Sequence, residues 1–340
     1  MHPKPQRRSR RTLLAAIAVT TALGAGIAGV AGAQDAAKDY PSKPIVMVVP
    51  YAAGGSSDTR ARQIGQKLAQ ILGKPVVVDN KPGAAGNIGT DFIARAAPDG
   101  YTIGIGNFAP LSVNKSLMSS MPFDPVKDLT PIILLEKGPI LLLVNADKSP
   151  YKTLADVIKD AKAKPDKLSF ASAGQGGAYH LAGEQFKDIT GTVITHVPYK
   201  GGGPAVTDLL GGQVDMMFDW ITAGMPHLTS NPPKFRALAI TSEKRSPLLP
   251  NVPTFEESGV KGMVMSNWFG VVGPKNLPPA IVTKLNQAIN KALQDPEVKE
   301  KITQGGNEVG GGDPASFAKF ISAESDRWAK LIKAKGIKPE

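Results

Sequence analysis

The chain has 340 residues, no cysteine and a formal net charge of +11. The lack of cysteine excludes disulfide bonds, thiolate metal sites, a cysteine nucleophile and a lipid-modified N-terminal cysteine. Lysine and arginine are scattered through the expected helices instead of forming stripes with interleaved aromatic residues, so no nucleic-acid-binding surface is indicated.

A secretory signal peptide is predicted for residues 1–33, which combine a basic start, an apolar stretch of small residues and an A-x-A site. We expect cleavage after Ala33 and a periplasmic mature protein. The segment carries five basic residues and no acidic one, so its removal lowers the net charge from +11 to +6. This modest positive excess suits a receptor for small anions. The pair Arg10 and Arg11 leaves twin-arginine export open beside the general secretory route.

Residues 44–72 form the opening unit of the mature chain. Residues 45–49 are a β-branched apolar run, as expected for a strand buried on both faces of a parallel sheet. A glycine-rich turn follows, and then an amphipathic helix for which Ser56 or Ser57 is the expected N-cap. A helix start beside a turn without bulky side chains offers its free backbone N–H groups to an anion.

The same pattern of strand, small-residue turn and helix recurs three times along the chain. The turns are residues 83–89 (GAAGNIG), 173–177 (AGQGG) and 200–204 (KGGGP). One such turn is as well explained by structure alone as by binding. Recurrence favours binding, because two facing turns of this kind hold a dicarboxylate through backbone amides without an arginine.

Strands alternating with helices predict parallel βαβ units. Strands are expected at residues 45–49, 75–79, 101–106, 168–171, 195–198, 214–218 and 237–241, and helices at 87–96, 154–163, 179–189 and 205–210. Apolar runs at 132–135 and 140–144, separated by Lys137-Gly138-Pro139, indicate a crossover between two domains, and the apolar run at 263–272 returns the chain. Residues 279–337 are expected to be helical and to cover the first domain.

The predicted fold is therefore α/β with two domains, each a mostly parallel sheet flanked by helices. Domain 1 is discontinuous, with residues 40–138 and 264–340, and domain 2 spans residues 139–263. Two chain crossings between the domains would act as hinges for closure around a ligand.

A catalytic or metal site is hard to assemble from the histidines of the mature chain, His180, His196 and His227. Ser172 lies in FASAG, which lacks the first glycine of a nucleophile elbow. His180 and Glu184 are one helical turn apart, but they lack further ligands, so we expect them to order a helix start. We expect no metal, no cofactor and no enzymatic activity.

A loose dinucleotide fingerprint occurs at Gly104, Gly106 and Ala109, but no well-placed acidic residue follows it. We interpret Asn107 instead as a polar group at the carboxyl end of a strand, where open α/β sheets bind ligands.

Other polar and aromatic residues lie beside the turns. Asp219 either receives an ammonium group of the ligand or caps the next helix, and the cap is slightly favoured. Lys200 either adds positive charge to the site or is solvated. The aromatic residues that could form walls of the pocket are Tyr51, Phe108, Tyr179, Tyr199 and Trp220.

A set of ordered motifs resembles the Bug receptors, the periplasmic solute-binding proteins of tripartite tricarboxylate transporters. The motifs are PYAAGGSSD (50–58), NKPGAAGNIG (80–89), PDGYT (98–102), HLAGE (180–184), HVPYKGGGPAVTDLLGGQVD (196–215) and VPTFEESG (252–259). The resemblance implies a two-domain Venus-flytrap receptor whose carboxylate ligand is held mainly by main-chain groups and water. It also implies membrane permease subunits as partners, and a monomer is expected.

In this family the first two turns grip a carboxylate, which implies that role here for Gly54, Gly55, Ser56, Ala84 and Ala85. The turns of the second domain close over the ligand. With the residues reasoned above, the ligand-binding candidates are Tyr51, Gly54, Gly55, Ser56, Ala84, Ala85, Asn107, Ser172, Gly174, Gly177, His180, Tyr199, Gly201 and Asp219. A periplasmic sensor with a signalling partner and a periplasmic hydrolase are the alternatives.

Overall fold

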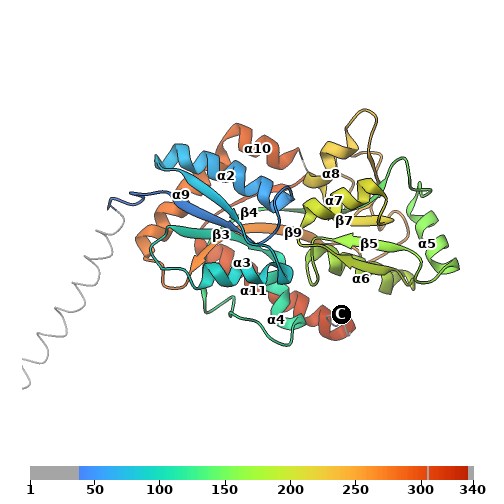
Figure 1. Ribbon diagram of the computed structural model, residues 1–340, viewed down its shortest axis with the longest axis horizontal. Helices are drawn as coiled ribbons and strands as arrows, with labels where there is room; N and C mark the ends of the chain where they lie inside the picture. The colour runs from blue at the N-terminus through green and yellow to red at the C-terminus, as the bar shows by residue number, and fades with distance from the viewer. Residues whose placement is uncertain (1–37, 305, 336–340) are drawn as a thin grey trace, which may run out of the picture.

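The computed structural model describes residues 38–304 and 306–335. It contains two α/β lobes whose sheets share one long strand, β4 (Leu129–Asn145) (Figure 1). The predicted signal peptide and its cleavage site lie outside the described residues. No helix in the described part of the chain is both long enough and apolar enough to cross a membrane.

The sheet of the first lobe has the strand order β2-β1-β3-β9-β4, with β10 also paired to β4. These strands are β1 (Ile45–Val49), β2 (Val76–Asn80), β3 (Thr102–Asn107), β9 (Ser266–Pro274) and β10 (Glu308–Gly311). The helices are α2 (Ser56–Leu72), α3 (Asn87–Ala94), α4 (Asn114–Leu117), α9 (Pro279–Gln294), α10 (Pro296–Thr303) and α11 (Pro314–Lys335), with a 3-10 turn η1 (Ala84–Gly86) and a π turn η2 (Ala109–Val113). Helices α2 and α9 pack together on one face of the sheet, and α3 and α11 cover the other (Figure 1).

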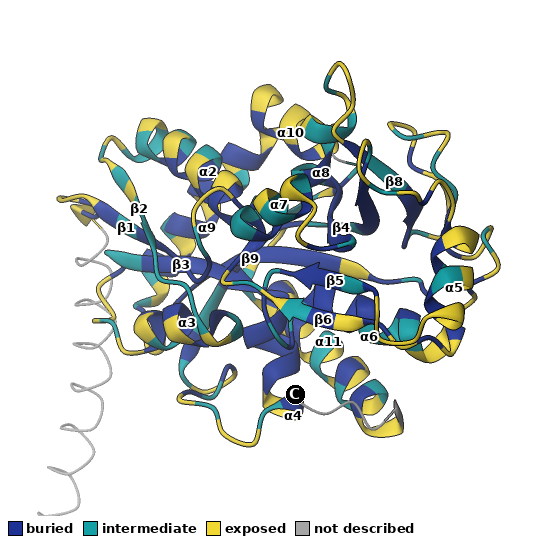
Figure 2. Cartoon of the chain, turned by 45° about the vertical axis from the view of Figure 1, so that its right-hand side comes forward, coloured by how far each residue is buried: buried dark blue, intermediate teal, exposed yellow. Residues whose placement is uncertain are grey.

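The second lobe has the strand order β6-β5-β7-β4, and β8 also pairs with β4. Its elements are α5 (Leu154–Ala163), β5 (Ser169–Ser172), α6 (Ala178–Thr190), β6 (Thr195–Pro198), α7 (Gly202–Gly211), β7 (Met216–Trp220), α8 (Ile221–Leu228) and β8 (Phe235–Ile240). In both lobes the central strands are largely buried, the edge strands β2, β6 and β10 are partly exposed, and exposed residues lie on the outer sides of the helices (Figure 2).

The α/β two-lobed fold class is confirmed, and the sheets are mixed. The pairs β1–β2, β1–β3, β5–β6 and β5–β7 are parallel, as the alternation of strands and helices predicts. Every pair that involves β4, and the pair β3–β9, is antiparallel. Strand β4 therefore joins two parallel units into mixed sheets.

The two apolar runs expected on either side of residues 137–139 are parts of one continuous strand, β4. Its first part pairs with β9 as far as Pro139 opposite Ser266, and from Ile140 its partners are β7 and β8. The change of partner allows Gly138 and Pro139 to remain in an extended strand. The chain thus crosses between the lobes inside one strand, and the exact domain boundaries remain a prediction.

Two further expectations differ from the structure. Strand β7 begins two residues later than expected, because the Asp215 carboxylate accepts hydrogen bonds from the backbone N–H and hydroxyl of Ser169 at the start of β5. The C-terminal part contains β10 besides its helices, because Glu308–Gly311 adds to the edge of β4 despite its glycines.

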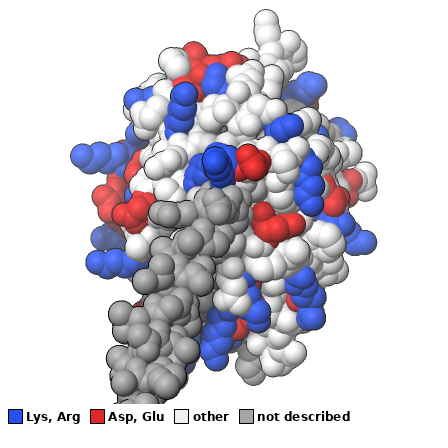
Figure 3. Space-filling view, turned by 90° about the vertical axis from the view of Figure 1, so that its left-hand side faces the viewer, with Lys and Arg blue, Asp and Glu red and all other residues white. Residues whose placement is uncertain are grey.

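Charged side chains of both signs are interspersed on the end of the first lobe that Figure 3 shows. This distribution fits the scattered lysines and arginines of the sequence and differs from the single-sign stripe that binds nucleic acid.

Candidate functional site

A cavity lies between the two lobes, next to the carboxyl ends of β1, β3 and β5. Its lining residues are Tyr51, Ser56, Ser57, Ala85, Asn107, Phe108, Ala109, Ala173, Gly174, Gly177, Ala178, Tyr179, Gly202, Asn267 and Phe269. It is narrow, with a volume of about 30 Å³. An outer hollow of about 210 Å³ shares Tyr51, Ala85, Ala173 and Gly174 with it and reaches Lys200.

Three helix starts converge on this cavity. Ser56 and Ser57 are the first residues of α2, Ala178 is the first residue of α6, and Gly202 is the first residue of α7; all four line the cavity. Each helix has a glycine N-cap and no side-chain cap hydrogen bond. The first backbone N–H groups of these helices therefore remain available for an anion or for water.

The expected serine N-cap of α2 is wrong. The N-cap is Gly55 in an extended conformation, with φ −84° and ψ 174°, and both serines lie inside the first turn. The nearby Asp58 carboxylate accepts a hydrogen bond from the N–H of Gly54 at 3.1 Å. Burial acts to raise the pKa of Asp58, but hydrogen bonds from Arg62, Gly54 and Asn80 outweigh it and lower the pKa. Asp58 thus holds the turn and leaves the serines facing the cavity.

The inner cavity has no charged lining residue in the described part of the chain. Arg60, one turn into α2, donates from Nε to Oε1 of Glu136 at 2.6 Å and from a terminal nitrogen to Oε2 at 2.8 Å. Both side chains are buried, so this cation anchors α2 to β4 instead of facing a ligand. Lys200 lines only the outer hollow. Any attraction for an anion in the inner cavity therefore comes from backbone N–H groups and neutral side-chain donors.

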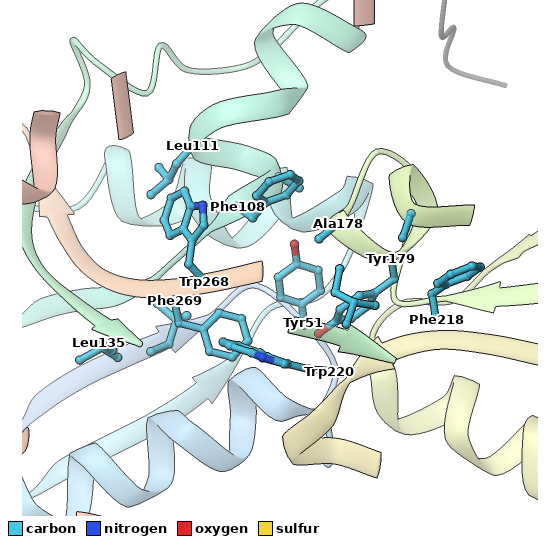
Figure 4. Packing of buried hydrophobic residues seen from close by; sticks show 14 of the residues in the cluster. Tyr51, Phe108, Leu111, Leu135, Ala178, Tyr179, Phe218, Trp220, Trp268 and Phe269 are labelled. Atoms are coloured by element: carbon cyan, nitrogen blue, oxygen red, sulfur yellow. The ribbon is translucent and has the colours of Figure 1, made fainter. Parts of the chain in front are cut away.

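Aromatic rings from both lobes form the walls. Tyr51, Phe108 and Phe269 of the first lobe and Tyr179 of the second are grouped where the lobes meet (Figure 4). The hydroxyl of Tyr51 donates to the carbonyl of Ala85 at 3.3 Å. Burial raises the pKa of Tyr51 and of Tyr179, so both hydroxyls stay protonated at neutral pH.

Two other aromatic candidates do not line the inner cavity. Trp220 packs edge-on against Phe269, with ring centroids 4.4 Å apart (Figure 4). Tyr199 lines the outer hollow, and its hydroxyl donates to Asp208 at 2.6 Å.

The lobes are in direct contact around the cavity. The backbone N–H of Ala52 donates to the carbonyl of Lys200 at 2.9 Å. The hydroxyl of Tyr179 lies 3.4 Å from that of Ser56 and accepts from the side-chain amide of Asn267 at 3.0 Å. These bonds connect α6 and the turn before α7 with the first lobe, so the two lobes touch at the edge of the cavity.

Ser172 and its neighbours organise the turn at residues 173–177. The hydroxyl of Ser172 is 2.7 Å from Nε2 of His196 and 3.2 Å from the carbonyl oxygen of Gly174. His180 stacks on His196, and its Nδ1 accepts from the N–H of Gly176 at 2.9 Å. Burial, and then the nearby His180, lowers the pKa of His196 to about 3. This buried group does not line the cavity, so a nucleophilic role for Ser172 finds no support.

The glycines of the loose dinucleotide fingerprint serve packing instead. Gly104 and Gly106 lie inside β3, where a Cβ would collide with Ile93 and with Leu111, respectively. Asn107, the last residue of the strand, lines the cavity as the position of strand ends in α/β sheets predicts.

The cap interpretation of Asp219 is wrong. Asp219 lies inside β7, the N-cap of α8 is Trp220, and α8 has no side-chain cap. Oδ1 of Asp219 instead accepts a hydrogen bond from the backbone N–H of Trp220 at 2.7 Å. Burial raises the pKa of Asp219 to about 7.

The structure places the sequence candidates in three groups. The inner cavity is lined by Tyr51, Ser56, Ala85, Asn107, Gly174 and Gly177. The outer hollow adds two further candidates, Ala84 and Tyr199. The candidates that line neither space are Gly54, Gly55, Ser172, His180, Gly201 and Asp219. Which of them contact a ligand stays a prediction. Sequence reasoning missed Asn267 and Phe269 on β9, although a lone asparagine inside the apolar run at 263–272 was a usable signal.

Comparison with known proteins places the chain in a family. The model described as "Tripartite tricarboxylate transporter family receptor" matches residues 60–337. Protein BugT of Bordetella pertussis is 41% identical over 327 residues, which is 96% of this chain and 98% of that protein.

Two solved structures support the same placement. The structure of the periplasmic binding protein BugD has a TM-score of 0.84 at 37% identity and covers 88% of this chain and all of its own. MatC from Rhodopseudomonas palustris with bound malate has a TM-score of 0.82 at 33% identity, covering 86% of this chain and all of its own. The family model describes a receptor, BugD is a periplasmic binding protein, and MatC holds malate. The chain therefore belongs to the tripartite tricarboxylate transporter receptor family, which includes the Bug proteins.

Proposed function

We propose that this protein is a periplasmic receptor that binds a small carboxylate between its lobes and delivers it to the permease subunits of a tripartite tricarboxylate transporter. The observation that carries the proposal is the convergence of three uncapped helix starts on one cavity without a charged side chain. The turn residues assigned from the sequence, together with Ser57, Ala178 and Gly202, are the proposed carboxylate-binding groups.

The energetics favour an acid ligand. A hydrogen bond to a charged group contributes about 1.5–3 kcal/mol, and a helix N-terminus adds about 0.3–1 kcal/mol for a nearby anion. Two or three such bonds, made in a cavity with buried aromatic walls, oppose the cost of association, which is about 4 kcal/mol or more. A cation would meet the positive ends of three helix dipoles and would be disfavoured.

The solved relatives support the ligand class. One R. palustris protein of 37% identity was solved with adipate, and MatC was solved with malate. Both ligands are aliphatic dicarboxylates, so a dicarboxylate is the first ligand to examine for this chain. Delivery to a permease, export to the periplasm and a monomeric state are proposed from membership of the family.

A thermal-shift screen of the mature chain against mono- and dicarboxylates, amino acids and aromatic acids tests the proposal. A ligand present at one hundred times its dissociation constant stabilises the folded state by about 2.7 kcal/mol. At least one acid should raise the melting temperature, while the corresponding amines should not. A protein that no acid stabilises would refute the proposed function.

A steric variant tests the location of the site. Ala85 lines both the inner cavity and the outer hollow, so Ala85→Trp should abolish stabilisation by the acid. Ala163 is exposed at the end of α5, and Ala163→Trp is the matched control that should bind as the parent does. Binding by Ala85→Trp as tight as that of the parent would show that the cavity is assigned wrongly.

A further inference from the structure

Two buried oxygen acceptors beside the cavity have no hydrogen-bond partner. They are Oδ1 of Asn107, whose residue is 5% exposed, and Oδ2 of Asp219, whose residue is 1% exposed. Within the residues that the structure describes, no hydrogen bond of ordinary geometry reaches either atom, although the nearby Tyr179 hydroxyl acts to lower the pKa of Asp219 against the larger effect of burial. Buried polar groups are nearly always paired, so two orphan acceptors beside one cavity indicate that something else supplies their donors.

Both acceptors lie at the carboxyl ends of strands, one from each lobe. Asn107 ends β3 and lines the cavity directly. Asp219 lies in β7, and its carboxylate faces Gly202, the lining residue that begins α7.

The space in front of Asp219 is large enough for a carbon-sized group. A Cβ added at Gly202 would lie 3.7 Å from Oδ2 of Asp219 and 3.8 Å from Cα of Gly55, which are ordinary van der Waals contacts. A carbon-sized gap therefore separates this carboxylate from Gly202, which lines the cavity.

The two kinds of protein group in the site make different demands on a ligand. The helix starts offer only N–H donors, and a carboxylate supplies only acceptors, so these two satisfy each other. A plain dicarboxylate would leave the acceptor on Asn107, and the acceptor on Asp219 in its ionised form, without donors. A hydroxyl or ammonium group on the ligand supplies the missing donor.

We propose that Asn107 and Asp219 are specificity-determining residues that select acids carrying a hydrogen-bond donor, a hydroxyl or an ammonium group, over unsubstituted acids of the same length. This inference rests on the proposed function, because it assumes that the cavity holds an acid. Sites built to bind a ligand hydroxyl or amine reject analogues that lack the group, since the buried protein partner is then left unpaired.

Isothermal titration calorimetry with matched acids tests the inference on the parent protein. The three series are succinate, malate and aspartate; glutarate, 2-hydroxyglutarate and glutamate; and adipate, 2-hydroxyadipate and 2-aminoadipate, with both enantiomers of each substituted acid. If the screen selects another carbon skeleton, the three members are built on that skeleton. In the best-binding series, the hydroxy or amino acid should bind at least about tenfold tighter than the unsubstituted acid.

Variants of the two residues test whether they cause the preference for the donor-bearing acid. Asp219→Leu and Asn107→Leu each remove an acceptor, and each should reduce the preference for the donor-bearing acid to about threefold or less. Asp215→Asn is the control, because this carboxyl lies just before β7, at the end away from Asp219, and binds Ser169. It should leave the preference unchanged.

The outcomes separate the inference from the function on which it rests. An unsubstituted acid that binds as tightly as its hydroxy and amino partners would overturn the inference and leave the carboxylate receptor standing. A preference that survives in both leucine variants would overturn the assignment to these residues. A protein that binds none of the acids would overturn the proposed function and the inference together.

Discussion

Replacing Gly203 by alanine should weaken ligand binding by hindering closure of the lobes. Gly203 is the second residue of α7, and a Cβ there would lie 2.6 Å from the carbonyl oxygen of Ala53 in the first lobe. This distance is far inside van der Waals contact, and the obstacle is backbone, so the lobes themselves must move apart. Alanine is a better helix former than glycine, so the second lobe alone loses nothing.

The magnitude follows from the cost of overpacking. Inserting a methylene-sized group into a well-packed contact costs about 1–3 kcal/mol. Each 1.4 kcal/mol is a factor of ten in an equilibrium constant, so the closed state becomes about 5- to 140-fold less populated relative to the open one. Because the acid is held by both lobes, its apparent dissociation constant should rise by the same factor.

Calorimetry with the acid identified by the screen measures the affinity, and small-angle X-ray scattering measures the radius of gyration of the liganded protein. Gly211→Ala, at the other end of α7, is the control. Its Cβ would approach only the Gln213 side chain, at 3.6 Å, so closure should be unaffected. The reasoning is refuted if Gly203→Ala binds within twofold of the parent and is equally compact with ligand.

Three further predictions concern charge and hydrogen bonds. Burial raises the pKa of Asp219 to about 7 from its usual 3.8, so the folded state favours the protonated form, and the stability due to this group is lost as the pH rises from about 4 to 7. The melting temperature of Asp219→Asn should therefore rise relative to that of the parent between pH 4 and pH 8, and an offset independent of pH would contradict this. Arg60→Met should cost about 3–5 kcal/mol in urea unfolding, because it leaves the Glu136 charge buried without its partner, and the double variant with Glu136→Leu should lose less. Tyr179→Phe removes a hydroxyl that bonds across the lobes and should weaken binding about 2- to 10-fold in calorimetry, whereas Tyr151→Phe, which loses a bond inside the second lobe, should not.

The early elements could be predicted because their signals are local. The strand expected at residues 75–79 is observed as Val76–Asn80, and the strand expected at 101–106 as Thr102–Asn107. A short apolar run between turn residues indicates a strand that is buried on both faces of a sheet, and the run can be recognised without knowledge of distant residues.

The elements that escaped prediction depend on partners far away in the sequence. Strand β4 continues through Gly138 and Pro139 because β9, more than one hundred residues later, pairs with it up to that point. Half of strand β10 is glycine, and the strand pairs only with the edge of β4 among the described residues. Neither feature has a propensity signal that a window of ten residues would contain.

The candidate site shows the same division between local and distant information. Glycine turns before the helices marked the cavity, but Asn267 and Phe269 reach it from a strand that sequence reasoning treated only as a return of the chain. The role of Asp219 depended on where β7 ends. A strand ending at residue 218 would free the carboxylate to cap α8, whereas the observed end at Trp220 keeps it inside the strand, beside the start of α7.

The glycine N-caps explain how a neutral cavity can attract an acid at little cost to the fold. Replacing a serine or aspartate N-cap by glycine costs a helix only a few tenths of a kcal/mol, because water solvates the exposed N–H groups. A side-chain cap at any of the three helices would occupy the donors that a carboxylate needs, each of which contributes about 1.5–3 kcal/mol to a charged partner. The small loss of helix stability is therefore outweighed by a single ligand hydrogen bond.

The loss of helix stability is also independent of whether the lobes are open, while the gain from the ligand requires that α2 in one lobe and α6 and α7 in the other face the same space. Ligand binding and lobe closure are coupled for this reason.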